Sequence, residues 1–414
     1  MKKKYISIIT DFSELEESHL HHWSFFYERL SKQFDQIFLI NSLNIRLFPK
    51  LAQKINSEKL NYKVDDEIKR LPKNFTLFDP KNEKDFSNFL ENKEILVINN
   101  FGKHFWSLKI YYLLKKYKIK QVQISNFGVF AGSGRMFKLN GFKNIYRAFL
   151  FFFFQTFFNK FTVILSNVGL VPKLEIRFLS NKDHLTNIQK SNLKKILFNK
   201  GFLFMKDIRL VNSRSYDISI VKKLNISEDY IVHLDASINY KEEVELRGKW
   251  DQNKINDHYY NLNKFLTKLS KVYKKEVKIC IHPLYDLKEH QSYFQNFEVL
   301  KHVTREYIYK SFIVTCFDSS AITDAILLKK KIIGLESSYM SENEILHSSN
   351  YPKKVGYLQL NTINDFKFDP INLLNKMEKK IENYDDFISR YHCFNKDKIG
   401  SDEIIRILKE KFFS

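Results

Sequence analysis

Three short apolar runs, separated by helical patterns, constrain the fold of this chain more than any other feature. They are Val277–Ile281, Phe312–Cys316 and Lys331–Leu335, and each is bounded by polar or turn-forming residues. Apolar runs of this length that alternate with helices are typical of buried parallel strands. The stretch from Val277 to Ser338 therefore predicts part of an open α/β sheet.

Polar residues follow each of these three predicted strands. They are His282-Pro283, Asp318-Ser319-Ser320 and Glu336-Ser337-Ser338. In open α/β sheets, ligands bind in the crevice at the carboxyl ends of the strands. We therefore expect the three clusters to line one crevice, with the strand before His282 next to the strand before Ser319.

The first two clusters contain residue types that suit a phosphate group. Ser319 and Ser320 precede the apolar run Ala321–Leu328, so they are predicted to begin a helix, where free N–H groups and the helix dipole attract anions. Equally, they could cap that helix without binding a ligand. Pro283 fixes the backbone after His282, whose imidazole can donate a hydrogen bond to a leaving phosphate or act as a general acid. Alone, His-Pro is an ordinary turn.

The whole chain alternates strands and helices, which predicts two α/β domains within its 414 residues. Further strands are expected at Tyr5–Ile9, Gln36–Ile40, Glu94–Ile98, Gln121–Ile124, Ile208–Val211, Tyr230–Leu234 and Val355–Leu360. Helices are expected at Phe105–Tyr117, Asp257–Tyr273, Ile371–Ile381 and Asp402–Phe412. A polar connection places the domain boundary near Lys223, so that residues 1–223 form one domain, and residues 224–414 form the other and end in a carboxy-terminal helix.

The formal net charge of +21 suits an anionic partner, such as nucleic acid, an acidic membrane surface, or a phosphorylated or carboxylated substrate. A coding bias that favours Lys, Asn, Ile and Phe together would explain the same composition without a partner. The Lys and Arg pairs are scattered, and no zinc-finger spacing or RNA-binding signature accompanies them. This pattern argues against nucleic acid.

The cysteines and the amino terminus indicate a cytoplasmic protein. Cys280, Cys316 and Cys393 are odd in number and far apart, and two of them lie in predicted buried strands. This favours a reducing compartment over a disulfide framework. The apolar run after the amino-terminal lysines breaks at Thr10-Asp11, too early for the ~7–15 residues of a signal peptide.

Two unusual segments follow the strand predicted at Gln121–Ile124. Ser125–Arg135 is dense in glycine and contains Gly132 and Ser133. It fits neither the dinucleotide fingerprint nor the Walker loop, and it is either a mobile loop or a loop that contacts substrate. Phe149–Phe161 is rich in Phe but lacks the ~18 uncharged residues of a spanning helix. It is either a buried core helix or an interfacial helix on an anionic membrane.

The pairing of His282-Pro283 with Asp318-Ser319-Ser320 resembles a known family. It is similar to the nucleotide-binding half of GT-B glycosyltransferases that use cytidine-activated donors, such as bacterial sialyltransferases, capsule Kdo-transferases and pseudaminic acid transferases. CDP-glycerol transferases of teichoic acid synthesis have a similar pair. The resemblance covers about Ile231–Ser338. It implies two Rossmann-like domains that face each other across a cleft, with the acceptor on the first and the nucleotide on the second.

The resemblance also implies an enzyme and roles for individual residues. His282 would contact the phosphate of CMP, Ser319 and Ser320 would hold the same phosphate, and Glu336 and Ser337 would lie near the ribose or the base. The reaction would move an acidic sugar, of nonulosonic or Kdo type, from a CMP-activated donor to a surface glycan or glycolipid at the inner face of the cytoplasmic membrane. The alternatives are a CDP-glycerol-type polyol-phosphate transferase and a non-catalytic membrane-surface binding protein.

The catalytic carboxylate has to be sought outside the family pattern, because the acidic-acidic-Gly motif of such sialyltransferases is absent here. Asp235, after the strand Tyr230–Leu234, could deprotonate the acceptor hydroxyl or attack the anomeric carbon. Asp11, after the first strand, is the second candidate, and either residue could instead cap a helix or lie in a loop. The sequence contains no Asp-x-Asp metal motif. We therefore expect no metal and no cofactor apart from the donor substrate.

Overall fold

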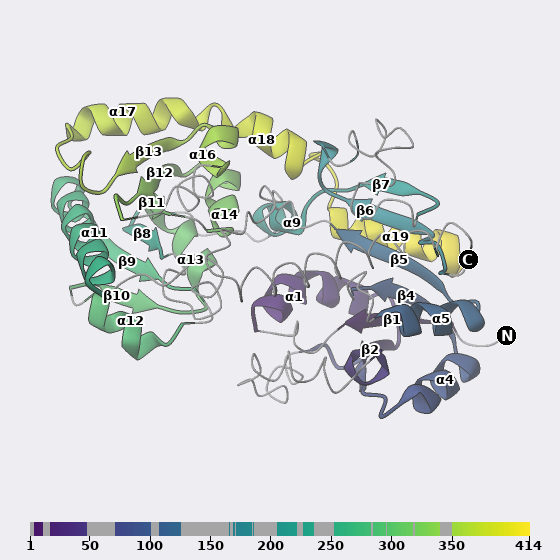
Figure 1. Ribbon diagram of the computed structural model, residues 1–414. Helices are drawn as coiled ribbons and strands as arrows, with labels where there is room; N and C mark the ends of the chain where they lie inside the picture. The colour runs from purple at the N-terminus through teal and green to yellow at the C-terminus, as the bar shows by residue number, and fades with distance from the viewer. Residues whose placement is uncertain are drawn as a thin grey trace. The chain divides into compact units, whose positions relative to one another are not determined.

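The computed structural model describes residues 4–10, 17–47, 71–100, 107–125, 165, 169, 171–183, 185, 205–221, 227–235, 252–282, 285–294, 296–317, 319–339 and 350–414. The described chain forms two compact units (Figure 1). The first contains residues up to Asp217 and returns at Cys393, and the second contains Ile218 to His392. The division therefore falls between Asp217 and Ile218, whereas the sequence predicted a boundary near Lys223.

The first unit is built on a parallel sheet with the strand order β3-β2-β1-β4-β5-β6-β7. Its strands are β1 (Lys4–Thr10), β2 (Ile37–Asn41), β3 (Phe75–Phe78), β4 (Glu94–Asn99), β5 (Lys120–Ser125), β6 (Ile176–Leu179) and β7 (Ile208–Leu210). Its helical elements are α1 (Glu17–Ser31), the 3-10 turn η2 (Leu43–Ile45), α4 (Glu83–Asn92), α5 (Leu108–Lys116) and α19 (Gly400–Phe412), and α9 (Arg214–Val221) spans the division between the units.

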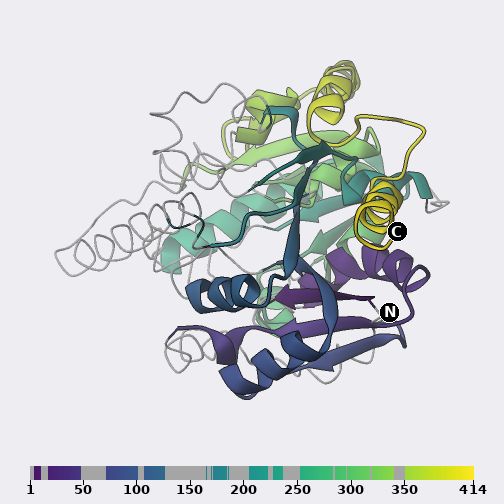
Figure 2. The ribbon, with the colours of Figure 1, turned by 90° about the vertical axis from the view of Figure 1, so that its right-hand side faces the viewer.

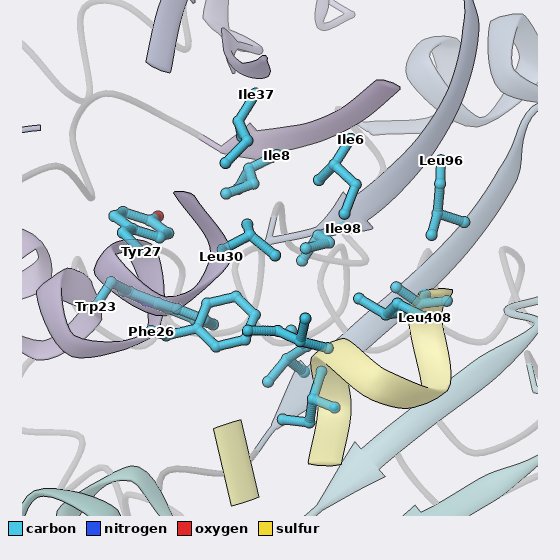
Figure 3. Packing of buried hydrophobic residues seen from close by; sticks show 14 of the residues in the cluster. Ile6, Ile8, Trp23, Phe26, Tyr27, Leu30, Ile37, Leu96, Ile98 and Leu408 are labelled. Atoms are coloured by element: carbon cyan, nitrogen blue, oxygen red, sulfur yellow. The ribbon is translucent and has the colours of Figure 1, made fainter. Parts of the chain in front are cut away.

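Apolar residues cover both faces of the first sheet, as expected for parallel strands. On one face, Trp23 and Phe26 of α1 and Leu408 of α19 pack against Ile6 and Ile98 of the sheet (Figure 3). Figure 2 shows α1 in purple and α19 in yellow on this same face. Alternate residues of the strands point to the other face, where they pack against α4 and α5.

The second unit repeats this architecture with the strand order β10-β9-β8-β11-β12-β13, and every adjacent pair is parallel. Its strands are β8 (Tyr230–Leu234), β9 (Glu276–Cys280), β10 (Glu298–Leu300), β11 (Ser311–Cys316), β12 (Lys331–Glu336) and β13 (Leu358–Asn361). Its helices are α11 (Gln252–Tyr273), α12 (Leu287–Tyr293), α13 (Thr304–Tyr309), α14 (Ile322–Leu327), α16 (Asn350–Val355), α17 (Pro370–Ile381) and α18 (Tyr384–Tyr391).

Helix α11 is the longest described helix of the second unit, and its apolar spacing explains how it packs. Ile255, Tyr259, Leu262, Leu266 and Leu269 recur every three or four residues and are buried. They form one stripe that packs on the sheet together with residues of α17. Helices α13, α14, α16 and α18 contribute to the cluster on the other face. The cysteines of β9 and β11 are buried, as predicted from their positions in apolar strands, and neither forms a disulfide bond.

The carboxy-terminal helix α19 belongs to the first unit, which corrects the prediction that it completes the second. Its residues Ile404, Ile405 and Leu408 lie in the same buried cluster as β1 and β4. Arg29 of α1 also forms an ion pair with Asp402 of α19. The amphipathic pattern of α19 predicts an apolar stripe but does not specify which sheet the stripe covers.

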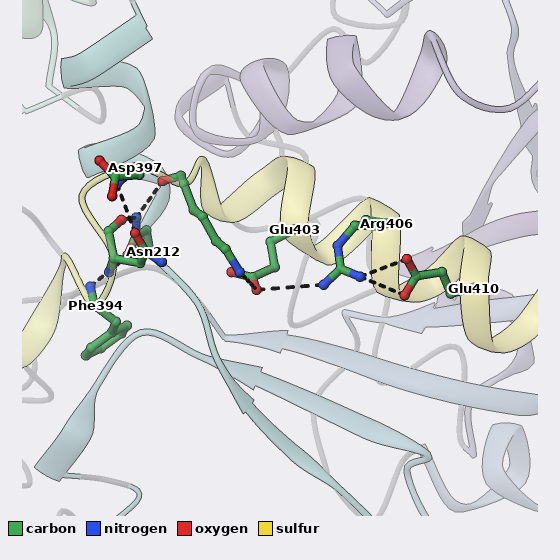
Figure 4. A network of polar contacts seen from close by, with 8 residues as sticks. Asn212, Phe394, Asp397, Glu403, Arg406 and Glu410 are labelled. Atoms are coloured by element: carbon green, nitrogen blue, oxygen red, sulfur yellow. Dashed lines mark hydrogen bonds and ion pairs between the residues drawn. The ribbon is translucent and has the colours of Figure 1, made fainter.

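Asn212 fixes the segment that leads into α19. Its amide nitrogen donates to the carbonyl oxygens of Asn395 and Lys398 at 2.6 and 2.7 Å, and its Oδ1 accepts the N–H of Phe394 at 2.7 Å (Figure 4). The side chain therefore satisfies backbone groups on both sides of the turn. Further along the same helix, Arg406 pairs with Glu410 at the surface.

Asp217 holds the first residues of α19. Its two carboxylate oxygens accept the N–H groups of Gly400 and Ser401 and the hydroxyl of Ser401, at 2.7, 2.8 and 2.7 Å. Burial raises the pKa of Asp217 to about 6, although these hydrogen bonds act to lower it. Gly400 lies so close to Asn212 that a Cβ would be 2.3 Å from the Asn212 carbonyl oxygen.

We expect Asp217→Ala to lower the free energy of unfolding by about 2–4 kcal/mol, because it leaves two buried N–H groups and a hydroxyl without their acceptor. The matched control is Asp402→Ala, which breaks a partly exposed ion pair on the same helix and should cost less than about 1 kcal/mol. Urea denaturation followed by circular dichroism measures both. Equal losses in the two variants would contradict the role of Asp217.

Candidate functional site

The strand order of the second unit brings several predicted site residues to one edge of the sheet. His282 lies just beyond β9, Asp235 directly follows β8, and Ser319 lies beyond β11. In the sheet these strands are ordered β9-β8-β11. The chain adds β9 and β10 on one side of β8 and then β11 to β13 on the other, so the topological switch point lies between β8 and β11. Ligands of open α/β sheets bind at such points.

The strands that precede His282 and Ser319 are not neighbours, contrary to the prediction. Strand β8 lies between them, and its Leu234 is paired with Cys280 of β9 and with Cys316 of β11. Two strand spacings correspond to about 10 Å. The reason is that the chain continues outward from β9 through β10 before it returns through α13 to β11. Asp235 consequently lies between the two predicted phosphate-binding groups along the sheet edge.

An aromatic stack anchors the turn that carries His282. The His282 side chain is exposed, and its carbonyl accepts the N–H of Tyr285 at 3.0 Å. Tyr285 is buried and stacks on His290 of α12, with ring centroids 3.9 Å apart. The ammonium of Lys301 donates to the Tyr285 carbonyl at 2.7 Å. The exposed imidazole therefore lies on a turn whose position is fixed by the contacts of Tyr285 with His290 and Lys301.

Asp235 lies in a buried cluster of polar side chains. The hydroxyl of Tyr259 on α11 donates to its Oδ2 at 3.3 Å. The Nε2 atoms of His290 and His233 lie 3.6 and 3.7 Å from its two carboxylate oxygens. The other ring nitrogen of His233, Nδ1, is 2.9 Å from the hydroxyl of Thr315 in β11. The cluster thus connects β8, β11, α11 and α12.

The burial of Asp235 limits its ability to act as a general base. Its side chain has 0% exposed surface, so an acceptor hydroxyl cannot touch the carboxylate in this conformation. A general base has to come within hydrogen-bond reach of the proton that it removes. The geometry therefore favours a positioning role for Asp235, which holds the elements around the switch point, over direct contact with substrate.

His258 of α11 is a third imidazole near this carboxylate. Burial lowers its pKa from 6.5 to about 4, and the repulsion of a charged His258 by His233 acts in the same direction, while Asp235 opposes the shift. The ring lies 4.9 Å from that of Phe317, measured between centroids. His258 is therefore neutral at ordinary pH and acts as an aromatic core residue.

Ser319 and Ser320 lie in the turn between β11 and α14. Ser319 is half-buried and Ser320 is exposed. The Oγ of Ser319 accepts the N–H of Ala321 at 3.3 Å, so its hydroxyl hydrogen can still be donated to an anion. The N–H groups of Ile322 and Thr323 are already bonded to the carbonyls of Ser319 and Ser320 at 3.2 Å. Since α14 is also only six residues long, the serine hydroxyls, rather than the helix start, are the groups suited to a phosphate.

Glu336 is the last residue of β12, the strand next to β11, and Ser337 follows it. Glu336 is half-buried, and its carbonyl accepts the N–H of Thr362 at 2.9 Å. Ser337 is buried, and its Oγ accepts the N–H of Tyr339 at 3.4 Å. Both residues thus lie at the same carboxyl edge as Ser319.

Several predicted residues lie outside the described part of the chain. They are Asp11, Gly132, Ser133, Pro283, Asp318 and the segment Phe149–Phe161. Among the residues that the structure does describe, no group of His, Cys, Asp and Glu side chains is arranged to hold a metal ion. None of the helices in this described part combines the length and the apolar character needed to cross a bilayer.

Sequence reasoning missed the side chains that surround Asp235. His233 had a usable signal, because residues two apart on a strand point to the same face, and His233 lies in β8 two residues before Asp235. Tyr259, Tyr285 and His290 had no such signal. Tyr259 lies on α11, Tyr285 in the turn before α12, and His290 on α12. Only tertiary packing brings them together.

No family model matches the chain, and no curated protein matches it. Solved structures share its fold at low sequence identity. The wall teichoic acid polymerase TagF has 12% identity and a TM-score of 0.52, with 98% of this chain and 90% of that chain covered. A structure of TagF soaked with CDPG has 12% identity and a TM-score of 0.50, with coverages of 98% and 88%. A putative UDP-N-acetylglucosamine 2-epimerase from Listeria monocytogenes has 13% identity and a TM-score of 0.50, with coverages of 100% and 97%. The chain therefore has a GT-B-like fold of two Rossmann-like α/β domains.

We expect the neutral His258 to make the protein less stable in acid. Its folded-state pKa lies below the unfolded value, so the unfolded state binds the proton first as the pH falls. Stability is retained above pH 6.5 and is lost as the pH falls toward 4, by up to ~3 kcal/mol. His258→Phe keeps a ring and removes the titration, so the urea midpoints of the variant and the wild type should diverge below pH 6.5. Parallel pH profiles would contradict the assignment.

Proposed function

We propose that the chain is a GT-B glycosyltransferase that moves an acidic sugar, of nonulosonic or Kdo type, from a CMP-activated donor to a surface glycan or glycolipid. The observation that carries the proposal is the row of polar groups at the carboxyl edge of the second sheet. His282 and Ser319 flank the topological switch point between β8 and β11. A location at the inner face of the cytoplasmic membrane is part of the same proposal.

In this proposal the donor phosphate binds between His282 and the two serines. The exposed imidazole of His282 donates a hydrogen bond to one phosphate oxygen, and the hydroxyls of Ser319 and Ser320 donate to others. Hydrogen bonds to a charged group are stronger than neutral ones. Glu336 and the buried Ser337, one strand further along the edge, lie near the ribose or the base.

The reaction requires one bond to form and one to break. The acceptor hydroxyl oxygen forms a bond to the anomeric carbon, and the bond from that carbon to the CMP oxygen breaks, so that CMP leaves with the electron pair. His282 and the serine hydroxyls stabilise the charge that develops on the leaving phosphate. The hydroxyl proton passes to a carboxylate, for which Asp11 is the candidate because Asp235 is buried.

A CDP-glycerol-type polyol-phosphate transferase is the second candidate. It is supported by the fold shared with TagF, which has been solved after soaking with CDPG. Both candidates require a cytidine nucleotide and differ in the group that is transferred. A non-catalytic membrane-surface protein would need no nucleotide at all.

Calorimetric titration with CMP, CDP, UDP and ADP tests the nucleotide assignment. We expect a cytidine nucleotide to bind at least tenfold more tightly than UDP or ADP. His282→Ala and the double substitution Ser319→Ala with Ser320→Ala should each weaken that binding about tenfold, because each removes charge-assisted hydrogen bonds worth about 1.5–3 kcal/mol. Ser389→Ala, an exposed serine of α18, is the matched control. Tighter binding of UDP or ADP, or of no nucleotide, would overturn the assignment.

The substitution Asp235→Asn tests whether Asp235 positions the elements around the switch point or acts as the general base. If Asp235 positions the elements around the switch point, the variant should bind CMP about fivefold more weakly, because the array from Tyr259 through His290 to Tyr285 loosens. Sugar transfer should fall by a similar factor. Unchanged CMP affinity together with a loss of turnover of about a thousandfold or more would instead identify Asp235 as the base.

A further inference from the structure

A groove lies along α11, and none of the residues assigned to the donor is among its described lining residues. Its volume is about 790 Å³. The lining comes from α11, from the end of α12 and from the loop before α17. From Asn256 to Val272 the lined part of α11 extends about 24 Å at a rise of about 1.5 Å per residue. The groove is thus long enough for a chain molecule.

The groove carries positive charge. Lys264, Lys268 and Lys271 line it at helical spacings of four and three residues, and no Asp or Glu is among its described lining residues. The ammonium of Lys264 lies 5.2 Å from the ring centre of Tyr260 and 5.7 Å from that of Phe366. Lys268 donates to the carbonyl of Phe366 at 2.6 Å. Lys264 and Lys271 are therefore the cations best placed to bind an anion.

Asn263 fixes the wall of the groove. Its amide nitrogen donates to the carbonyls of Tyr259 and Tyr293, both at 2.7 Å, which fixes the orientation of the side chain and joins α11 to the end of α12. Its Oδ1 is buried, so a ligand in the groove does not touch that oxygen. The contribution of Asn263 is therefore a rigid wall between the lysines and the aromatic rings.

Aromatic rings complete the lining. Tyr259 and Tyr293 stack with centroids 4.4 Å apart, and Tyr260 is 63% exposed beside them. Exposed aromatic rings pack well against the apolar faces of sugar rings, because they bury large areas at a low cost in side-chain entropy. Cations, a fixed amide and aromatic rings along one groove form a combination that suits an acidic carbohydrate.

We propose that this groove binds an anionic glycan chain, whose carboxylates or phosphates pair with Lys264 and Lys271 and whose sugar rings pack against Tyr260. The choice of a glycan rests on the proposed function. A membrane surface fits less well, because interfacial binding uses protruding apolar side chains, whereas this lining is hollow and contains amides and hydroxyls. The groove is a binding site additional to the donor site, and it retains an acceptor or product chain.

Fluorescence anisotropy of the full chain with labelled sialic acid oligomers and labelled glycerol phosphate oligomers tests this proposal. We expect at least one of the two to bind, and dextran oligomers of the same length to bind at least tenfold more weakly. The double substitution Lys264→Gln with Lys271→Gln should weaken binding at least fivefold, and Tyr260→Ala about threefold. Lys254→Gln removes the same charge from the same helix outside the groove, and should change the affinity less than twofold.

The controls distinguish this inference from the proposed function. The groove variants should leave CMP affinity unchanged, so failure of oligomer binding with intact CMP binding overturns the groove alone. Absence of CMP binding overturns the donor assignment, whatever the oligomers do. Equal losses in the Lys254→Gln variant, or binding of phosphatidylglycerol vesicles without binding of either oligomer, would also overturn the groove proposal.

Discussion

The central position of β8 in the second sheet decides where the polar residues of the candidate site lie. Since the chain places β9 and β10 on one side of β8 and β11 to β13 on the other, the connections diverge at β8 and leave the edge above it open. His282 and Ser319 occupy the two sides of that opening. A sheet in which β11 followed β9 directly would put these two residues on adjacent strands, with no carboxylate between them. The strand order therefore brings Asp235 into the site.

A buried carboxylate is costly unless its neighbours compensate for the lost hydration. Asp235 receives a hydrogen bond from Tyr259 and lies within 4 Å of two imidazole nitrogens. Each of these contacts comes from a different element, since His233 lies in β8, Tyr259 on α11 and His290 on α12. Loss of the carboxylate would remove the common partner of three elements at once. In its proposed positioning role, a residue without exposed surface would therefore act on the exposed His282, because the turn that carries His282 contacts His290 through Tyr285.

Most of the strands were predictable, although β3, β6 and β10 were missed, but the order of the strands was not. Tyr230–Leu234 has the bounds that the sequence predicted, because a short apolar run between polar residues is a local signal. β10 (Glu298–Leu300) is three residues long and gives no periodic signal, and without it β9 and β11 looked like neighbours. The same limit applies to the site. His282 could be located because it directly follows a strand, whereas His290 and Tyr259 lie on helices and reach Asp235 only through packing.

Tyr259 belongs to both proposed binding regions of the second unit. Its ring lines the groove and stacks on Tyr293, while its hydroxyl donates to Asp235 at the switch point. The ring is only 2% exposed, so a ligand in the groove would act on Tyr259 through neighbouring side chains such as Tyr293, which stacks on it. Because closely packed interiors transmit small displacements, the proposed occupation of the groove would affect the geometry around Asp235. A chain-elongating enzyme would benefit from this link, since a bound product chain would then bias the site that prepares the next transfer.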